Sequence, residues 1–399
     1  MFRMRRSFLP VGQGAFYLER SFIDEKEINV VYDCGSINQK YIDREIDAAF
    51  INRTRIDAVY ISHFDNDHVS GLKKLLQRFD VKNVFLPLVE RKNRYLSLMA
   101  GSIENHGNKE KVSMQELEQF VNSPSAYIRE VSGSHSETRV ILVEAYNTEK
   151  RHNIETSFEG VNESNTIIVP SGKPTNEYIN DELKISDAIC GWTYTPYNIE
   201  NNNKRIRLEE ELSKTLGKKV NLDIITQDEI KNLITHNFRE IKEAYKKLPG
   251  GLNSNSLVLF SGSKSDGLRQ YRVFGENCFK MMCRQRSSCS ICRQELKNGC
   301  LYLGDFDASN KYSWNTMCAA LGSLLNYAGC IQIPHHGSKN SYCTDIALLG
   351  QQADCIISVG ENSQYGHPSS DVLLDMLKHE IFAIVVTENQ NSRADYYIK

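Results

Sequence analysis

The stretch that decides the fold is Ser62-His63-Phe64-Asp65-Asn66-Asp67-His68-Val69-Ser70-Gly71, residues 62–71, which holds two histidines and two aspartates within six residues. The apolar run 56–62 before it predicts a β-strand, and residues 69–79 after it carry apolar side chains at helical spacing. All four side chains can therefore converge on one point in a strand-end loop. We expect a metal site there, whereas a simple helix cap would account for one aspartate and for neither histidine.

The sequence on both sides of this stretch alternates strand and helix patterns, which is typical of α/β layers. Strands are predicted at 8–18, 28–36, 81–89, 255–262, 301–306, 330–334, 355–360 and 382–387, with helices at 38–51 and 370–379. Three segments fit this alternation poorly and are interpreted as insertions into one domain spanning 1–399: a mixed segment at 90–160, a helical segment at 198–252 and a cysteine-rich segment at 263–300.

Composition restricts the classes of protein to consider. The 399 residues are 40% hydrophobic and 25% charged, which is ordinary for a globular chain. A net charge of −2 excludes a polycationic field over the whole molecule, so nucleic acid would need a local basic patch. No run approaches the roughly 18 apolar residues that cross a bilayer, and the start of the chain does not match a secretion signal. We expect a cytoplasmic protein with no membrane contact.

Four further motifs, one before this stretch and three after it, occur in an order that suits a single strand-end site. They are VGQGAFYL with VVYDCGS (11–18 and 30–36), LGDFD (303–307), PHHGS (334–338) and YGHP (365–368). Each motif alone is weakly specific, because a His-His-Gly-Ser loop or a Gly-Asp turn is common. Together with the first stretch they form a specific set.

This set resembles the metallo-β-lactamase superfamily, and within it the metallo-β-lactamase domain of the DNA-uptake channel proteins of competent bacteria. The resemblance implies an αββα sandwich with a dinuclear metal site, in a bacterial protein of housekeeping or phage defence. Two departures stand out: Asp65 replaces the middle histidine of the usual signature, and Pro10 and Ala15 replace the aspartates that usually flank VGQG.

The resemblance also implies roles for individual residues. His63 and Asp65 would bind one metal, Asp67 and His68 the other, and Asp305 would bridge the two. Asp33 would support a metal-bound histidine, and Gly337 and Ser338 would donate hydrogen bonds to a phosphate. The full sets are metal ligands His63, Asp65, Asp67, His68, Asp305 and His336, and catalytic residues Asp67, His335, His336 and His367.

Two divalent ions about 3.5–4 Å apart activate water and stabilise a leaving oxygen, so hydrolysis is the expected reaction. A carboxylate-rich site favours Mn²⁺ or Mg²⁺ relative to Zn²⁺, and phosphodiesters relative to lactams. DNA, RNA or a nucleotide messenger is therefore the expected substrate. A protein partner in a larger complex is a separate expectation. The alternatives are a lactone or thioester hydrolase on the same fold, and a non-catalytic module that binds nucleic acid.

The cysteine-rich segment predicts a second kind of site. Five of the 11 cysteines, Cys278, Cys283, Cys289, Cys292 and Cys300, lie within 23 residues. Four thiolates suit a structural Zn²⁺, while free core thiols and redox chemistry are the alternatives. Residues 263–300 carry eight basic against three acidic side chains. Because the segment precedes the strand that leads to Asp305, we expect it beside the active-site end of the sheet, where a polyanionic substrate enters.

Four further histidines lie between the stretch 62–71 and the LGDFD motif: His106, His135, His152 and His236. The superfamily often has one more metal-binding histidine between the first cluster and the Gly-Asp motif, and His135 or His152 would be in the right part of the chain. Neither belongs to a recognisable motif, so we interpret both as surface residues.

Overall fold

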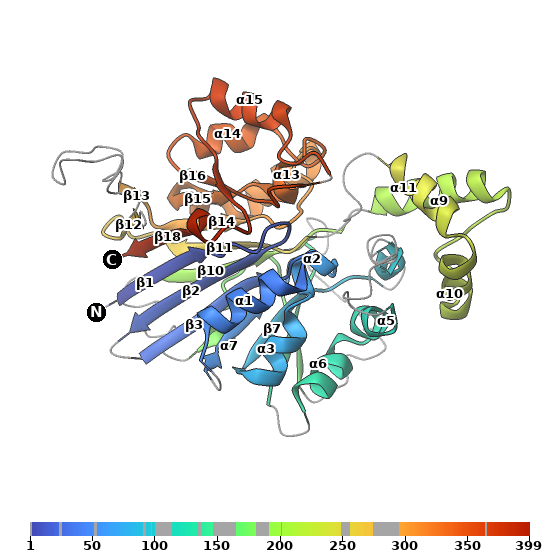
Figure 1. The fold of residues 1–399 in the computed structure, drawn as a ribbon, viewed down its shortest axis with the longest axis horizontal. Helices are drawn as coiled ribbons and strands as arrows, with labels where there is room; N and C mark the ends of the chain where they lie inside the picture. Colours follow the sequence, from blue (N-terminus) through green and yellow to red (C-terminus); the bar gives the residue numbers. More distant parts are fainter. Residues whose placement is uncertain are drawn as a thin grey trace.

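Two β-sheets lie face to face, and helices cover the outer side of each (Figure 1). The computed structural model describes residues 2–23, 26–51, 54–90, 93–96, 98–99, 114–133, 137–146, 165–180, 191–200, 202–248, 256–273, 295–363 and 365–399. All statements about structure below refer to these residues. The predicted αββα sandwich is confirmed.

The larger sheet holds both ends of the described chain. In spatial order its ten strands are β13 (Glu295–Lys297), β12 (Arg269–Val273), β18 (Ala394–Ile398), β1 (Phe2–Phe8), β2 (Phe16–Ile23), β3 (Lys26–Cys34), β5 (Ala58–Tyr60), β7 (Asn83–Pro87), β8 (Arg139–Val143) and β9 (Thr166–Val169). Neighbours from β13 to β3 are antiparallel, and those from β3 to β9 are parallel. β4 (Arg55–Ile56) and β6 (Asp80–Val81) form a separate two-stranded pair.

The smaller sheet is built from the second half of the chain. Its strands, in spatial order, are β10 (Trp192–Tyr197), β11 (Val258–Ser263), β14 (Gly299–Tyr302), β15 (Ala328–Gln332), β16 (Asp354–Ser358) and β17 (Ile384–Val386). β14 to β17 run parallel, with Cys300 opposite Cys330 and Ile331 opposite Cys355. Parallel strands bring their carboxyl ends to one edge, so the loops after β14, β15 and β16 lie together.

Helices form the outer layers and an appendage. On the outer face of the larger sheet lie α1 (Gln39–Ala49), α2 (Asn66–Val69), α3 (Leu72–Arg78), α5 (Met114–Asn122) and α6 (Pro124–Ser132). In contrast, α7 (Asn176–Ile179) hydrogen-bonds to β10 and packs in the cluster between the sheets. On the smaller sheet lie α13 (Lys311–Leu321), η2 (Gly322–Tyr327), η3 (Pro334–Gly337), α14 (Thr344–Gly350), α15 (Ser370–Lys378) and η4 (Gln390–Ser392). The appendage at the right of Figure 1 consists of α9 (Asn202–Leu216), α10 (Gln227–His236) and α11 (Phe238–Lys246).

The alternation of side chains along each strand explains why the layers form. Successive residues of a strand point to opposite faces, so Val31 and Val59 pack under the helices whereas Tyr32 and Tyr60 pack between the sheets. A third cluster lies between the smaller sheet and α13, α14 and α15. The three apolar clusters correspond to the three interfaces of a four-layer sandwich.

The start of the chain differs from the prediction. The run 8–18 was predicted as one strand, but β1 ends at Phe8 and β2 begins at Phe16. Pro10 and the glycines of VGQG interrupt the strand, and the resulting turn donates Ala15 N–H to the carbonyl of Asp67 at 3.1 Å. The VGQG motif thereby contacts the stretch 62–71 through its backbone.

Two of the predicted insertions prove to include sheet strands. In the mixed segment 90–160, the helices α5 and α6 form a crossover between β7 and β8, which are parallel neighbours. In the cysteine-rich segment 263–300, β12 and β13 extend the edge of the larger sheet. The helical segment 198–252 contains α9, α10 and α11 as predicted, and its apolar side belongs to the same cluster as α5 and α6.

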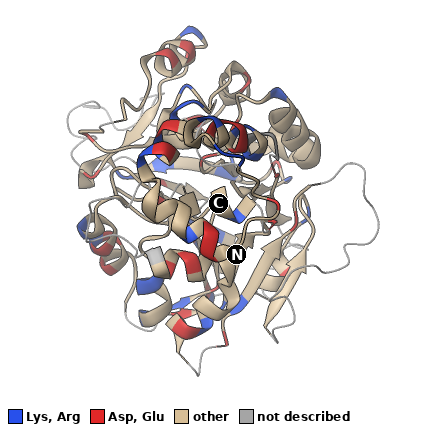
Figure 2. Ribbon diagram, turned by 90° about the vertical axis from the view of Figure 1, so that its right-hand side faces the viewer, with Lys and Arg blue, Asp and Glu red and all other residues tan. Residues whose placement is uncertain are grey.

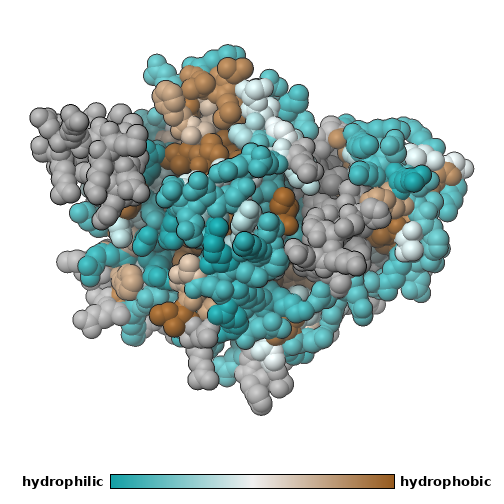
Figure 3. All heavy atoms as spheres, in the orientation of Figure 1, coloured by the Kyte–Doolittle hydropathy of each residue, from teal (hydrophilic) through white to brown (hydrophobic). Residues whose placement is uncertain are grey.

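The surface of the sandwich has mixed charge and one notable apolar area. Lys and Arg residues alternate with Asp and Glu over the side shown in Figure 2, in keeping with the net charge of −2. Apolar side chains gather over α14, α15 and the segment before β17 (Figure 3), where Leu374 is 56% and Phe382 79% exposed. Among the described helices, none has the length and apolar composition needed to cross a bilayer.

Candidate metal centre

The stretch 62–71 forms a loop and a short helix after β5. Asp65 is the residue before α2 and has extended backbone, yet its side chain makes no capping hydrogen bond. Its carbonyl accepts the N–H groups of His68 and Val69 instead, at 2.9 and 3.1 Å. The carboxylate of Asp65 lies 3.6 Å from His63 Nε2. A structural cap therefore does not explain this side chain, which points toward the histidine.

Two overlapping groups of buried side chains could hold metal ions. The first comprises His63, Asp67 and His68, and the second comprises His68, Asp305 and His336. In each group the ligand atoms all lie within 4.8 Å of one another. His68 belongs to both, and Asp67 Oδ2 is 3.1 Å from His336 Nε2, so the groups are contiguous.

The grouping differs from the predicted one. Asp67 and His68 were expected on one metal and His63 with Asp65 on the other, but His63 groups with Asp67 and His68, and Asp65 belongs to neither group. The reason is the turn of α2, which places Asp67 and His68 side by side and facing His336 of the other sheet. The role of Asp65 as a ligand stays a prediction.

The other ligands come from the carboxyl ends of β14 and β15. Asp305 follows Gly304, and the N–H of Asp305 donates to Ser256 Oγ at 3.0 Å. His336 lies in η3, where His335 and His336 both have positive φ, 49° and 54°. Together with Asp33 at 54°, they are three of the four non-glycine residues with positive φ in the described chain. Such backbone is uncommon and concentrates at functional sites.

Hydrogen bonds fix the orientation of three histidine rings. His68 Nδ1 donates to Asp33 Oδ2 at 2.8 Å, and His336 Nδ1 donates to the carbonyl of Ser358 at 2.7 Å. His63 Nδ1 lies 2.8 Å from Ser62 Oγ, which itself donates to Asp33 at 2.7 Å. Each ring therefore directs Nε2 toward the centre, the arrangement found around metal-bound imidazoles. The prediction for Asp33 agrees with this geometry, while Ser62 was not singled out beforehand.

The environment of one atom, His68 Nε2, indicates whether these residues suit a metal ion. Within the described part of the chain, His68 Nε2 is buried and makes no hydrogen bond. It lies 3.2 Å from Asp305 Oδ1 and 3.8 Å from Asp67 Oδ1, at the point that both groups share. An unsatisfied buried nitrogen costs free energy, and a divalent cation would satisfy it. The imidazole and carboxylate donors therefore fit one or two divalent metals.

The charges of the site reinforce one another. Although burial opposes ionisation, the positive charges of His68 and His336 hold the pKa of Asp67 below its ordinary value. Asp305 is likewise buried, yet His335, His68 and His63 hold its pKa well below the ordinary value. Conversely, burial disfavours the charge of His68, but Asp67, Asp305 and Asp33 raise its pKa well above the ordinary value. Metal ions and protons would therefore compete for the same site.

His335 and His367 lie at the outer edge of the centre. His335 Nε2 is 3.6 Å from Asp305 Oδ2, and its ring centroid is 5.6 Å from that of His367. Burial lowers the pKa of His335, and burial together with the charges of His335 and His336 lowers the pKa of His367 to about 4. Both rings are thus neutral near pH 7 and can accept a proton.

The two predicted phosphate donors are already engaged in part. Ser338 is buried, its N–H donates to the carbonyl of His335 at 2.9 Å, and its hydroxyl accepts the N–H of Asn340 at 3.4 Å. Gly337 packs against Pro368, which a Cβ at Gly337 would approach to 2.8 Å. The N–H of Ser338 therefore holds the turn of η3 rather than facing a substrate.

Most of the predicted zinc ligands, and three of the four additional histidines, lie outside the described residues. Those are Cys278, Cys283, Cys289, Cys292, His106, His135 and His152. Cys300 is described: it is buried between the sheets, and burial raises the pKa of its thiol well above the ordinary value. That opposes the thiolate form that zinc requires. His236 is exposed on α10, and the zinc site stays a prediction.

The cysteine-rich segment was expected beside the active-site end of the sheet. This is wrong for its base, the described residues 263–273 and 295–300. Lys297 lies over the ring of Tyr327, just before β15 begins, and Arg272 pairs with Asp354 at the start of β16. The base therefore packs on the amino ends of β15 and β16, whereas the metal centre lies at their carboxyl ends. The cause is β14 itself, which separates Gly299 from Asp305 by the length of a strand.

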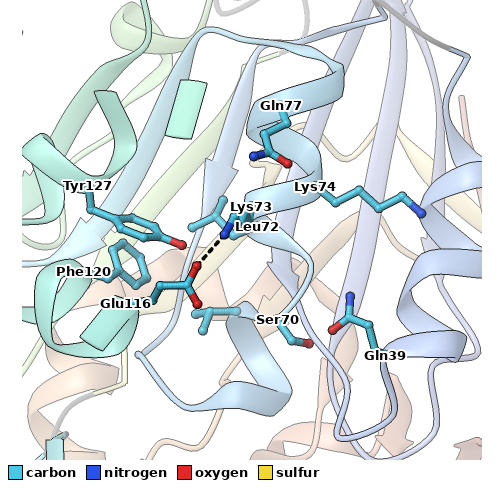
Figure 4. A pocket seen from close by; sticks show the side chains of 10 residues that line it. Gln39, Ser70, Leu72, Lys73, Lys74, Gln77, Glu116, Phe120 and Tyr127 are labelled. Atoms are coloured by element: carbon cyan, nitrogen blue, oxygen red, sulfur yellow. Dashed lines mark hydrogen bonds and ion pairs between the residues drawn. The ribbon is translucent and has the colours of Figure 1, made fainter. Parts of the chain in front are cut away.

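A cavity of about 240 Å³ lies beside α2 (Figure 4). Its lining comes from α1, α2, α3, α5 and α6 and includes Phe120, Tyr127 and an ion pair between Lys73 and Glu116. None of the histidines or aspartates of the two ligand groups lines it. The chemistry therefore belongs to the strand-end cluster and not to this cavity.

Comparison with known proteins agrees with this geometry. Residues 21–98 match the model of the metallo-beta-lactamase superfamily. This segment covers β3, α1, β5, α2 and α3, and with them Asp33, His63, Asp67 and His68. No curated protein matches the chain significantly. The domain match and the histidine–aspartate groups together support a metal-dependent hydrolase.

Proposed function

Because residues 21–98 match the model of the metallo-β-lactamase superfamily, we propose that the protein is a metal-dependent phosphodiesterase acting on DNA, RNA or a nucleotide messenger. The observation that carries this proposal is the donor set around His68 Nε2. Three carboxylates, those of Asp65, Asp67 and Asp305, accompany the histidines of the centre. Carboxylate oxygens select hard cations, and hard cations bind phosphoryl oxygens well.

Divalent ions bound here would supply Lewis acidity and lower the pKa of an attacking water. The residues of the chain perform the remaining tasks. Asp33, the Ser62 hydroxyl and the Ser358 carbonyl orient the histidine rings through their hydrogen bonds. The carboxylates of Asp67 and Asp305 stay ionised, and their negative charge would stabilise a bound cation. In hydrolysis, water oxygen bonds to phosphorus, one ester P–O bond breaks, and the leaving oxygen gains a proton.

His335 and His367 are the residues placed to move that proton. Both are neutral near pH 7 because burial lowers their pKa values. Among the side chains at the centre, His335 is partly exposed, at 22%, and so faces both the cluster and solvent. We assign to this pair the acceptance of the proton from water and its delivery to the leaving oxygen.

The direct test is hydrolysis of bis-p-nitrophenyl phosphate by the purified protein with Mn²⁺, Mg²⁺ or Zn²⁺, beside a lactone and a thioester. We expect metal-dependent turnover of the phosphodiester alone. Asp67→Ala should lower kcat at least about 100-fold, because it removes a ligand and a charge at the centre. The matched control is Asp345→Asn, an exposed carboxylate in the first turn of α14.

Three outcomes distinguish the alternatives. Turnover of the lactone or thioester without phosphodiester cleavage would support a hydrolase of non-phosphate substrates. Absence of all turnover, with retained affinity for oligonucleotides, would support a non-catalytic binding module. Wild-type turnover by Asp67→Ala would show that the stretch 62–71 is not the reaction centre. Circular dichroism of the variant checks that it remains folded.

A further inference from the structure

A tyrosine ring lies exposed beside the metal centre. Tyr365 belongs to the loop between β16 and α15, and 60% of its surface is exposed. Its ring is nearly parallel to that of His367, with an interplanar angle of 16° and centroids 6.3 Å apart. A Cβ placed on the intervening Gly366 would meet no atom within 4 Å, so there is open space beside this backbone.

The tyrosine is the outer end of a row of aromatic rings that starts at the metal centre. The ring centroids of His336 and His335 are 6.2 Å apart, and those of His335 and His367 are 5.6 Å apart. Exposure rises along the row: His336 is buried, the His335 side chain is 22% exposed, and Tyr365 is the most exposed member. The row therefore leads from the metal centre to open solvent.

We propose that Tyr365 stacks on the nucleobase next to the scissile phosphodiester and so favours a nucleic acid or nucleotide over a simple phosphodiester. The inference rests on the proposed function and adds the residue that contacts the base. In a nucleotide the base lies a few atoms from the phosphate. In the row of rings, Tyr365 is the second ring beyond His335. An aromatic face stacks on any base, so this contact selects for a base without selecting its sequence.

The kinetic test compares thymidine 5′-(p-nitrophenyl phosphate) with methyl p-nitrophenyl phosphate, which share a leaving group and differ in the nucleoside. For wild type we expect a higher kcat/KM for the nucleotide. Tyr365→Ala should lower the ratio of the two kcat/KM values by roughly 5- to 150-fold, the effect of one base–aromatic stack. Tyr365→Phe should keep the ratio. Tyr397→Ala, which removes an exposed tyrosine of β18, is the matched control.

A binding test separates this inference from the proposed function. In an Asp67→Ala background, fluorescence anisotropy measures the affinity for a thymidine decamer and for an abasic decamer with the same phosphates. Adding Tyr365→Ala should weaken binding of the thymidine decamer by roughly 5- to 150-fold and spare the abasic one. Equal losses for both decamers, no loss for either, or no binding of the thymidine decamer by the Asp67→Ala protein would overturn the inference. Failure of wild type to hydrolyse either ester would overturn the proposed function, while the anisotropy result would still decide the stacking.

Discussion

At the scale of single residues, His68 is where the interactions of the centre converge. Its Nδ1 donates to Asp33, and its Nε2 belongs to both ligand groups. Ser62 supports the arrangement, because its hydroxyl lies within hydrogen-bond distance of both Asp33 and His63. Neither ring can rotate without losing one of these bonds. Residues that never touch a substrate therefore determine where the ligand atoms are.

The role of Ser62 can be measured directly. Ser62→Ala should weaken Mn²⁺ binding by about 10- to 100-fold, because it removes the hydrogen bond that orients His63. Isothermal titration calorimetry of the metal-free protein gives the dissociation constant. Ser261→Ala is the control, since Ser261 is equally buried but hydrogen-bonds to Glu19 in the core. If both variants bind Mn²⁺ as wild type does, His63 does not depend on Ser62.

A prediction about metal preference concerns Asp65. Asp65→His should shift the ratio of Zn²⁺- to Mn²⁺-supported activity toward Zn²⁺ by about tenfold or more, because imidazole replaces a hard oxygen donor beside His63. The comparison uses the same phosphodiester with each metal in turn. An unchanged ratio would mean that Asp65 does not contact a metal.

At the scale of secondary structure elements, the position of a strand along the chain was easier to predict than the strands that it pairs with in the sheet. The apolar run before Ser62 and the helical spacing after it indicated the strand–loop–helix unit that the structure shows as β5, α2 and α3. By contrast, β12, β13 and β18 were missed as parts of the larger sheet. Their pairing joins residues 269–273 with 395–398, a long-range contact that no local pattern encodes.

The same difference between local pattern and long-range contact applies to the metal centre. The residue types and the strand-end positions of His63, Asp67, His68, Asp305 and His336 could be identified from motifs. Their grouping could not, because it depends on the turn of α2 and on how the two sheets face each other. The hydrogen bonds of Ser62 and the occupied N–H of Ser338 likewise depend on geometry of a few ångströms. Sequence spacing does not contain that information.

The strand-end turn before Asp305 allows a steric prediction. A Cβ at Gly304, where φ is 54°, would lie 2.5 Å from Ser256 Oγ and 2.7 Å from Ser62 Cβ. Gly304→Ala should therefore lower the free energy of unfolding by about 1–3 kcal/mol and also weaken metal binding, because Asp305 and Ser62 would move. Gly217→Ala shares a positive φ of 64° but meets nothing within 4 Å.

Chemical denaturation and metal titration of both glycine variants separate the two effects. Gly217→Ala should show only the cost of backbone conformation, with wild-type metal affinity. If Gly304→Ala also binds metal as wild type does, Asp305 keeps its place without the glycine, and the close packing of this turn does not position the ligand.

At the scale of the whole molecule, the charge arrangement predicts opposite pH responses with and without metal. The raised pKa of His68 stabilises the metal-free protein fully below about pH 6.5, and this contribution is lost as the pH rises through the raised value. The lowered pKa values of Asp67 and Asp305 contribute above about pH 4 and are lost as the pH falls through the lowered values. Metal binding displaces protons and so strengthens as the pH rises.

Thermal unfolding measures this difference. Between pH 6 and 9 the Tm of the EDTA-treated protein should fall, while the increase in Tm on adding Mn²⁺ should grow. At a free metal concentration 1,000 times the dissociation constant, binding stabilises the folded state by about 4 kcal/mol. A metal-induced increase in Tm that shrinks with rising pH would contradict the proton competition inferred for the centre.

The two ligand groups take side chains from opposite ends of the chain, His63, Asp67 and His68 from one sheet and Asp305 and His336 from the other. During synthesis on the ribosome, the first group emerges some 240 residues before Asp305 does. A nascent chain can thus offer only half of the centre, and full metal capture must wait until the second sheet has been translated and has docked. Loading is in this sense a checkpoint on completed folding, because a chain truncated before residue 336 would lack both His336 and β18, the strand that pairs with β1 in the larger sheet.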